Sequence, residues 1–125
     1  MNNLFSVEGK VAVVTGGSRG IGEMIAAGYL ANGAKVYISS RKADACNETC
    51  NRLMKEYGGE CLAIPADLSN LDGVNSFTEE FSKKESNLDI LVNNAGVAWG
   101  APLSDFPELG WDKVMNTNVK GVFFL

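Results

Sequence analysis

The sequence predicts an α/β protein with a doubly wound parallel sheet. Short runs rich in β-branched residues alternate with longer runs whose apolar residues recur every three or four positions. Glycines such as Gly33 and Gly58 stand where the helical runs are expected to end. Parallel neighbours must be joined by a long crossover, which is usually a helix, so this alternation predicts one parallel sheet with helices on its faces.

The predicted elements follow the order β-α-β-α-β-α-β, and a last helical pattern starts near residue 111. Strands are expected at 10–14, 35–39, 60–64 and 88–92, and helices at 21–31, 43–57 and 71–83. The apolar faces read from the spacing are Ile21, Met24, Ile25, Gly28 and Tyr29 in the first helix and Leu71, Val74, Phe77 and Phe81 in the third.

Composition limits the class of protein. The chain has 125 residues, 46% of them hydrophobic, which suits one globular domain with its own core. A net charge of -4 without a basic run argues against nucleic-acid and anionic-membrane partners. No apolar run is long enough to span a membrane, and no charged-then-apolar leader precedes the first strand. We therefore expect a cytoplasmic protein.

The three cysteines are predicted to be reduced core residues. Cys46 and Cys50 could place two metal ligands on one helical face, but the chain has no histidine to complete a common zinc set. Both also continue an apolar series at steps of three and four, and Cys61 leaves their number odd. We expect core packing and no metal site.

A glycine-rich turn follows the first predicted strand and opens into a helix. It reads Gly16, Gly17, Ser18, Arg19, Gly20, Ile21 and Gly22. Such a turn lets the backbone approach a pyrophosphate, whose charge is met by free N–H groups and the helix dipole. A glycine-rich turn can also be a plain connector, but its place between strand and helix favours a Rossmann-type nucleotide site, in the crevice between the first and fourth strands.

The second predicted strand ends in basic residues. Ser40 and Arg41 stand where an acidic residue would bind a free ribose 2′-hydroxyl. An arginine can grip a 2′-phosphate with two N–H groups, and Arg19 is a second candidate donor. The pattern predicts NADP(H); the alternative is a solvated charged loop.

Small or polar residues also follow the other two strands. Asp67 and Leu68 come after the third strand, and Asn93, Asn94, Ala95 and Gly96 after the fourth. Each could be a turn former or a helix cap. Their coincidence at the strand ends, where doubly wound folds bind ligands, favours a cofactor site.

Asn118 falls on an otherwise apolar face of the last helical pattern. Leaving a buried amide unpaired would cost about 1 to 3 kcal/mol, so this side chain is either hydrogen-bonded for structural reasons or held for function. The spacing does not decide between the two.

Together these motifs resemble the short-chain dehydrogenase/reductase family over nearly the whole chain. They are Thr15-Gly-x-x-x-Gly-x-Gly, Asp67-Leu68, Asn93-Asn94-Ala95-Gly96 and Asn118. Within the family the sequence is most similar to NADPH-dependent 3-oxoacyl-[acyl-carrier-protein] reductases, including their rhamnolipid-pathway relatives. The resemblance implies hydride transfer between NADP(H) and a carbonyl or alcohol, with a small-molecule or acyl-thioester substrate, in a homo-oligomer.

The resemblance also implies roles for residues. Residues 16–22 would hold the pyrophosphate and adjacent ribose, Arg41 and Arg19 the 2′-phosphate, and Asp67 with Leu68 the adenine. Asn94 would lie beside the cofactor ribose. Asn118 would be catalytic, fixing a water that relays protons to a lysine.

The catalytic Tyr-x-x-x-Lys motif of the family is missing from this sequence. No tyrosine is followed by lysine four positions later, since Gly33, Arg41 and Cys61 stand at those positions. We expect residues 1–125 to be the N-terminal half of the fold, truncated within the helix that starts near residue 111 and inactive alone. A non-catalytic NADP(H)-sensing module is the alternative.

Overall fold

A computed structural model describes residues 3–125 and confirms the predicted parallel sheet. Its strands are β1 Val11–Thr15, β2 Lys35–Ser39, β3 Cys61–Ala63 and β4 Ile90–Val92, in the order β3-β2-β1-β4. All three pairings are parallel. Because β4 lies on the far side of β1 from β2, the sheet has the topological switch between its first and fourth strands that the sequence predicts.

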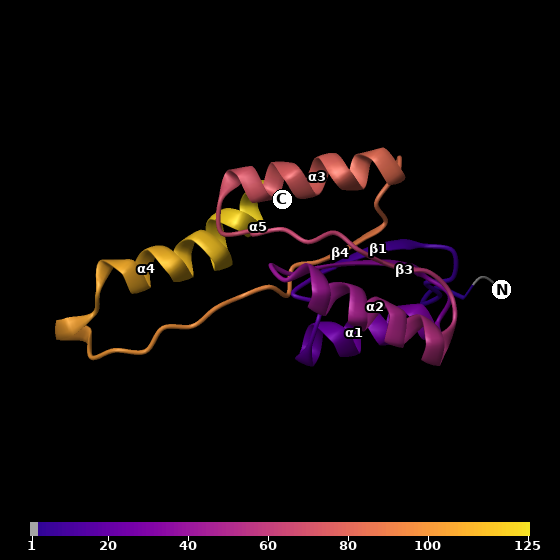
Figure 1. Cartoon of the computed structure of the whole chain (residues 1–125), viewed down its shortest axis with the longest axis horizontal. Coiled ribbons are helices and arrows are strands. Elements are labelled where there is room, and N and C mark those ends of the chain that lie inside the picture. The colour runs from indigo at the N-terminus through magenta and orange to yellow at the C-terminus, as the bar shows by residue number, and fades with distance from the viewer. Residues whose placement is uncertain (1–2) are drawn as a thin grey trace.

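Helices cover both faces of the sheet (Figure 1). Helices α1, Gly20–Ala31, and α2, Ala43–Tyr57, lie on one face, and α3, Leu71–Lys84, lies on the other. Each strand contributes apolar side chains to the core on both faces of the sheet, because successive side chains of a strand point to opposite faces. Val14 and Ile38 pack toward α1 and α2, whereas Val13 and Tyr37 pack toward α3.

The buried face predicted for α2 is confirmed, whereas the one predicted for α1 is only partly correct. In α2, Cys46 and Cys50 are buried and free, as predicted, and Cys61 of β3 packs beside Cys50 with the two sulfurs 3.3 Å apart. In α1 the predicted buried face is wrong in part: Ile25 and Tyr29 pack against the core, but Ile21 and Met24 are 66% and 64% exposed. The buried residues are Gly22, Ala26 and Leu30, since small side chains let the helix approach the sheet closely.

The C-terminal segment departs from a single regular helix. A loop after β4 leads through a 3-10 turn, Leu103–Asp105, to α4, Glu108–Met115, which begins three residues before the predicted start. A π-helical turn, Asn116–Lys120, then joins it to α5, Gly121–Phe124. Figure 1 shows α4 and the preceding loop extending away from the sheet, with α5 returning beside α3.

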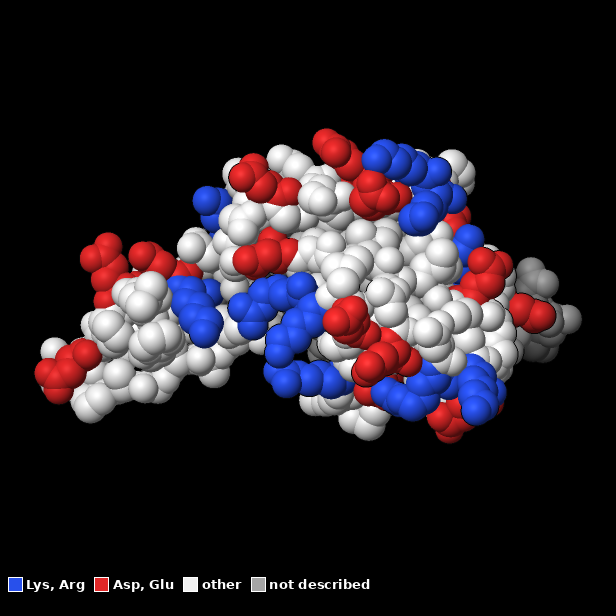
Figure 2. Space-filling view, viewed as in Figure 1, with Lys and Arg blue, Asp and Glu red and all other residues white. Residues whose placement is uncertain are grey.

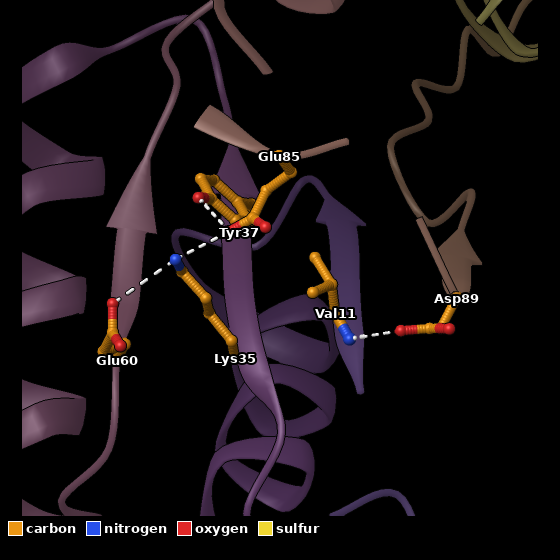
Figure 3. Close-up of polar contacts among 6 residues, drawn as sticks. All are labelled: Val11, Lys35, Tyr37, Glu60, Glu85 and Asp89. Atoms are coloured by element: carbon orange, nitrogen blue, oxygen red, sulfur yellow. Dashed lines mark hydrogen bonds and ion pairs between the residues drawn. The ribbon is translucent and has the colours of Figure 1, made fainter. Parts of the chain in front are cut away.

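A charged network ties β2, β3 and the end of α3 together at the amino-terminal edge of the sheet (Figure 3). The Lys35 ammonium lies 2.6 Å from the Glu85 carboxylate and 3.5 Å from that of Glu60. The buried Tyr37 hydroxyl donates to the same Glu85 oxygen at 2.7 Å. These two bonds lower the pKa of Glu85, and its carboxylate raises the pKa of Lys35.

Glu85→Gln is expected to destabilise the fold by about 1 to 2 kcal/mol at pH 7, because the charge that Lys35 and Tyr37 both contact is lost. Since the folded pKa of Glu85 is depressed, its contribution is present above the ordinary value of 4.5 and fades as the pH falls through the folded pKa. The difference between variant and wild type, measured by urea unfolding, should therefore shrink in acid.

Glu80→Gln is the matched control, because Glu80 pairs with Lys83 on the exposed surface of α3, the helix that Glu85 follows. Surface pairs of this kind contribute little to stability. An equal effect of the two substitutions, or a pH-independent effect at Glu85, would contradict the role given to the network.

Charges of both signs are interspersed on the face of the molecule in Figure 2, so the net charge of -4 forms no single acidic surface there. Within residues 3–125, no helix has both the length and the apolar character that a membrane crossing requires.

Candidate functional site

The predicted site residues gather where the carboxyl ends of the strands meet. The glycine-rich turn leaves β1 and passes β2, where the Gly17 N–H donates to the Ser39 carbonyl at 3.2 Å. On the other side it meets the segment after β4, which begins at Asn93. The parallel register brings these segments together, although they lie far apart in sequence.

Thr15 and Asn94 lock the β1 and β4 ends to each other. The buried Thr15 hydroxyl accepts the backbone N–H groups of Asn94 and Ala95 at 3.0 and 2.9 Å. In return the Asn94 amide donates to the carbonyls of Thr15 and Gly16 at 3.0 and 3.3 Å. This side chain therefore shapes the glycine-rich turn, whatever else it contacts.

Three carbonyls of the turn are bound by protein donors, whereas some of its N–H groups are free. Besides the Gly16 carbonyl, that of Ser18 accepts from the Thr49 hydroxyl at 2.7 Å and that of Arg19 from the Glu23 N–H at 3.3 Å. Within residues 3–125, the N–H groups of Ser18 and Arg19 have no protein acceptor. Free donors beside a helix N-terminus are the chemistry of an anion site.

Two glycines are required for different reasons. Gly20 has a φ of +60°, and a Cβ there would meet open space, so the position needs glycine for its backbone conformation and keeps the surface clear. At Gly22 a Cβ would lie 2.2 Å from the Gly16 carbonyl oxygen. Gly22 thus allows α1 to start directly against the turn.

The end of β2 presents an arginine without a carboxylate partner. Arg41 is exposed and, within residues 3–125, forms no ion pair, as is also true of Arg19. The Ser40 hydroxyl lies 3.0 Å from the Cys46 sulfur, and the Ser40 carbonyl accepts the Ala66 N–H at 3.0 Å. These contacts hold the base of the loop and leave the guanidinium in solvent.

Asp67 begins a turn after β3. Its Oδ1 accepts the Ser69 N–H at 3.0 Å and the Ser69 hydroxyl at 2.6 Å, which lowers the pKa of Asp67, with a further contribution from the positive charge of Arg41. The cap of α3 is Asn70 rather than Asp67. Leu68 is partly buried in the core beneath α3.

Asn118 is solvent-exposed, so the expectation of a buried amide is wrong. Both ends of its side chain nevertheless bond to the backbone of Val97, with its oxygen accepting the N–H and its amide donating to the carbonyl, each at 2.9 Å. Gly96 lies alongside, since a Cβ there would be 3.4 Å from the Asn118 oxygen. The asparagine thereby fixes the segment after β4 to the π-helical turn.

Sequence reasoning included Thr15 in the glycine-rich motif but gave its hydroxyl no role, and it missed Thr49. Thr15 and Thr49 are both buried polar residues within apolar patterns, at 2% and 3% exposure. A threonine within an apolar pattern could have indicated these roles, because a buried hydroxyl needs a hydrogen-bond partner.

Comparison with known proteins accounts for this arrangement. The model of the short chain dehydrogenase family matches residues 10–125. The chain belongs to this family. It is 51% identical over 123 residues to the rhamnolipids biosynthesis 3-oxoacyl-[acyl-carrier-protein] reductase of Pseudomonas aeruginosa, covering 98% of this chain and 47% of the relative. Gluconate 5-dehydrogenase of Gluconobacter oxydans is 37% identical, with 98% and 48% covered.

Solved structures of similar proteins superpose closely on this chain. The Pseudomonas aeruginosa RhlG/NADP active-site complex superposes with a TM-score of 0.91 at 52% identity, covering 99% of this chain and 48% of that one. The L-sorbose reductase of Gluconobacter frateurii, complexed with NADPH and L-sorbose, gives 0.90 at 31% identity, with 94% and 45% covered. The chain spans about half the length of the relatives it matches.

Proposed function

We propose that this chain is the NADP(H)-binding half of an oxidoreductase that transfers hydride between the nicotinamide cofactor and a carbonyl or alcohol. The observation that carries the proposal is the glycine-rich turn, in which protein donors bind the carbonyls of Gly16, Ser18 and Arg19. The N–H groups of Ser18 and Arg19 have no protein acceptor within residues 3–125. The NADP and NADPH complexes among the similar structures support it.

The residues present fit the phosphates of this cofactor. The free N–H groups and the start of α1 would hold the pyrophosphate, and the open space over Gly20 leaves room for it. Arg41 and Arg19 would bind the 2′-phosphate, with Ser40 at the base of that loop. Asp67 and Leu68 would border the adenine, while Asn93, Asn94, Ala95 and Gly96 would border the ribose and nicotinamide. The cofactor, when bound, supplies the hydride.

Arg41→Asp tests the cofactor choice. The substitution should weaken NADP(H) binding about tenfold or more, because a charge-assisted bond to phosphate is lost and a like charge replaces it. The dissociation constants of NADPH and NADH, measured by fluorescence titration of the full-length gene product, check this. Lys42→Asp is the control for net charge alone. Equal affinity for both cofactors, before and after the change at Arg41, would refute the assignment.

For catalysis we propose that Asn118 fixes a proton-relaying water and that the proton-donating groups lie outside residues 1–125. The likeness to the rhamnolipid-pathway reductase supports a 3-oxoacyl thioester as substrate. In this proposal residues 1–125 are one half of the enzyme and are inactive alone.

A non-catalytic NADP(H)-sensing module remains the second candidate. Both ends of the Asn118 side chain are already bonded to Val97, which a purely structural asparagine would also show. Reading about 50 further encoded residues decides between the two, because short-chain dehydrogenases place their tyrosine and lysine there.

We further propose a cytoplasmic homo-oligomer. The three free cysteines agree with a reducing compartment. The exposed Leu109 and Trp111 on α4 suit contact with another copy or with further chain.

A further inference from the structure

A buried hydroxyl of α2 contacts the glycine-rich turn from behind. Thr49 is 3% exposed, and its Oγ1 donates to the Ser18 carbonyl at 2.7 Å. Within residues 3–125 no other protein group donates to that carbonyl. Thr49 lies between Cys46 and Cys50 on the inner face of α2, which is fixed against the sheet by core packing. The donor is therefore held by the core, whereas the acceptor belongs to a loop.

This bond sets the direction of a peptide plane. The Ser18–Arg19 peptide is trans, so its carbonyl and its N–H point in opposite directions. Because Thr49 draws the Ser18 carbonyl toward α2, the Arg19 N–H must point away from α2. That N–H is one of the free donors of the turn. Without the hydroxyl, the peptide could rotate and withdraw it.

The Thr49 hydroxyl orients the Ser18–Arg19 peptide and not the neighbouring peptides of the turn. The Gly16 carbonyl is held by Asn94, and the Arg19 carbonyl is held by the helical N–H of Glu23. An ion pair between Glu23 and Arg52 also joins α1 to α2, on the surface. The Ser18 carbonyl, like that of Gly16, is held by a single side chain, and the N–H of its peptide, unlike that of Gly17, has no protein acceptor within residues 3–125.

We propose that Thr49 is a positioning residue for the cofactor: its hydroxyl turns the Arg19 N–H outward to receive a phosphate oxygen of NADP(H). The proposal rests on the proposed function, since it needs a bound dinucleotide. It adds that α2, through the bond from Thr49 to the Ser18 carbonyl, partly sets the affinity of the site. Thr49 acts through Arg19 and takes no part in hydride transfer.

Thr49→Val in the full-length gene product is the test, because valine keeps the shape of threonine without its hydroxyl. The dissociation constant for NADPH should rise about tenfold, equivalent to 1.4 kcal/mol, and KM for NADPH should rise with it. The kcat at saturating NADPH and the midpoint of unfolding should stay near wild type. Thr49→Ser, which restores the donor, should restore the affinity.

Thr78→Val is the matched control. Thr78 donates its hydroxyl only to a carbonyl of its own helix, α3, at 2.9 Å, far from the glycine-rich turn in sequence. This variant should bind NADPH like wild type. If it weakened binding as much as Thr49→Val, the effect would be a general loss of stability and the proposal would be overturned.

The remaining outcomes separate this proposal from the proposed function. If the wild type binds neither NADPH nor NADP, both fail. If the wild type binds NADPH and a folded Thr49→Val variant binds it equally well, only the role of Thr49 fails. Should valine prevent folding, Thr49→Ala and Thr49→Ser differ by the hydroxyl alone, and equal affinity of these two would overturn the proposal.

Discussion

Gly22→Val is expected to abolish NADP(H) binding while leaving most of the sheet intact. A Cβ at this position would lie 2.2 Å from the Gly16 carbonyl oxygen and 2.5 Å from the Asn94 amide nitrogen. Neither neighbour is free to move, because the two bond to each other and Asn94 also bonds to Thr15. The turn must deform, and affinity should fall by about a hundredfold or more.

The measurement is an NADPH titration paired with circular dichroism, to establish that the variant is folded. Gly28→Val is the matched control, because Gly28 lies in the same helix and a Cβ there meets nothing within 4 Å. Gly20→Val should also lose binding, through its φ of +60° and the space that its side chain would fill. A folded Gly22→Val variant with unchanged affinity would show that the turn is only a connector.

Residues 1–125 expressed alone are expected to show no reductase activity. No tyrosine here stands four residues before a lysine, and loss of general acid catalysis typically costs a factor of about 10² to 10⁴. The assay is NADPH oxidation with a 3-oxoacyl thioester. The same chain extended through the downstream encoded residues is the control, and it should turn the substrate over.

The isolated 125 residues should also self-associate. β4 is an edge strand, and Leu103, Leu109 and Phe123 are 94%, 70% and 79% exposed. Unpaired edges and large exposed apolar surfaces favour association. Sedimentation and amide exchange would reveal it. A stable monomer that reduces the thioester would contradict both expectations and the proposal that residues 1–125 are one half of the enzyme.

Local patterns in the sequence were enough to predict the fold. The alternation of short strands with helices predicts a parallel sheet, and the glycine-rich turn after the first strand favours the dinucleotide-binding order, which the structure has as β3-β2-β1-β4. The glycine-rich turn was located for a similar reason, since its conformation requires glycine at fixed places between a strand and a helix. The packing of Cys46 and Cys50 followed from helical spacing alone.

What periodicity could not determine was which side of α1 meets the sheet. The helix is apolar nearly all round, so Ile21 and Met24 looked as suitable for burial as Ala26. Close approach of α1 to the turn decided it, because only Gly22 fits against the Gly16 carbonyl. The exposure of Asn118 likewise depends on the π-helical turn, which changes the helical spacing locally.

The sequence by itself determined the order of the elements, the turn that would bind an anion and the basic end of β2, because each is encoded in neighbouring residues. Only the tertiary structure decided which groups hold that turn in place. The Asn94 backbone N–H donates to the Thr15 hydroxyl across 79 positions, and the Thr49 hydroxyl reaches the Ser18 carbonyl across 31. Such bonds form only after the sheet and α2 have packed, and no local pattern specifies them.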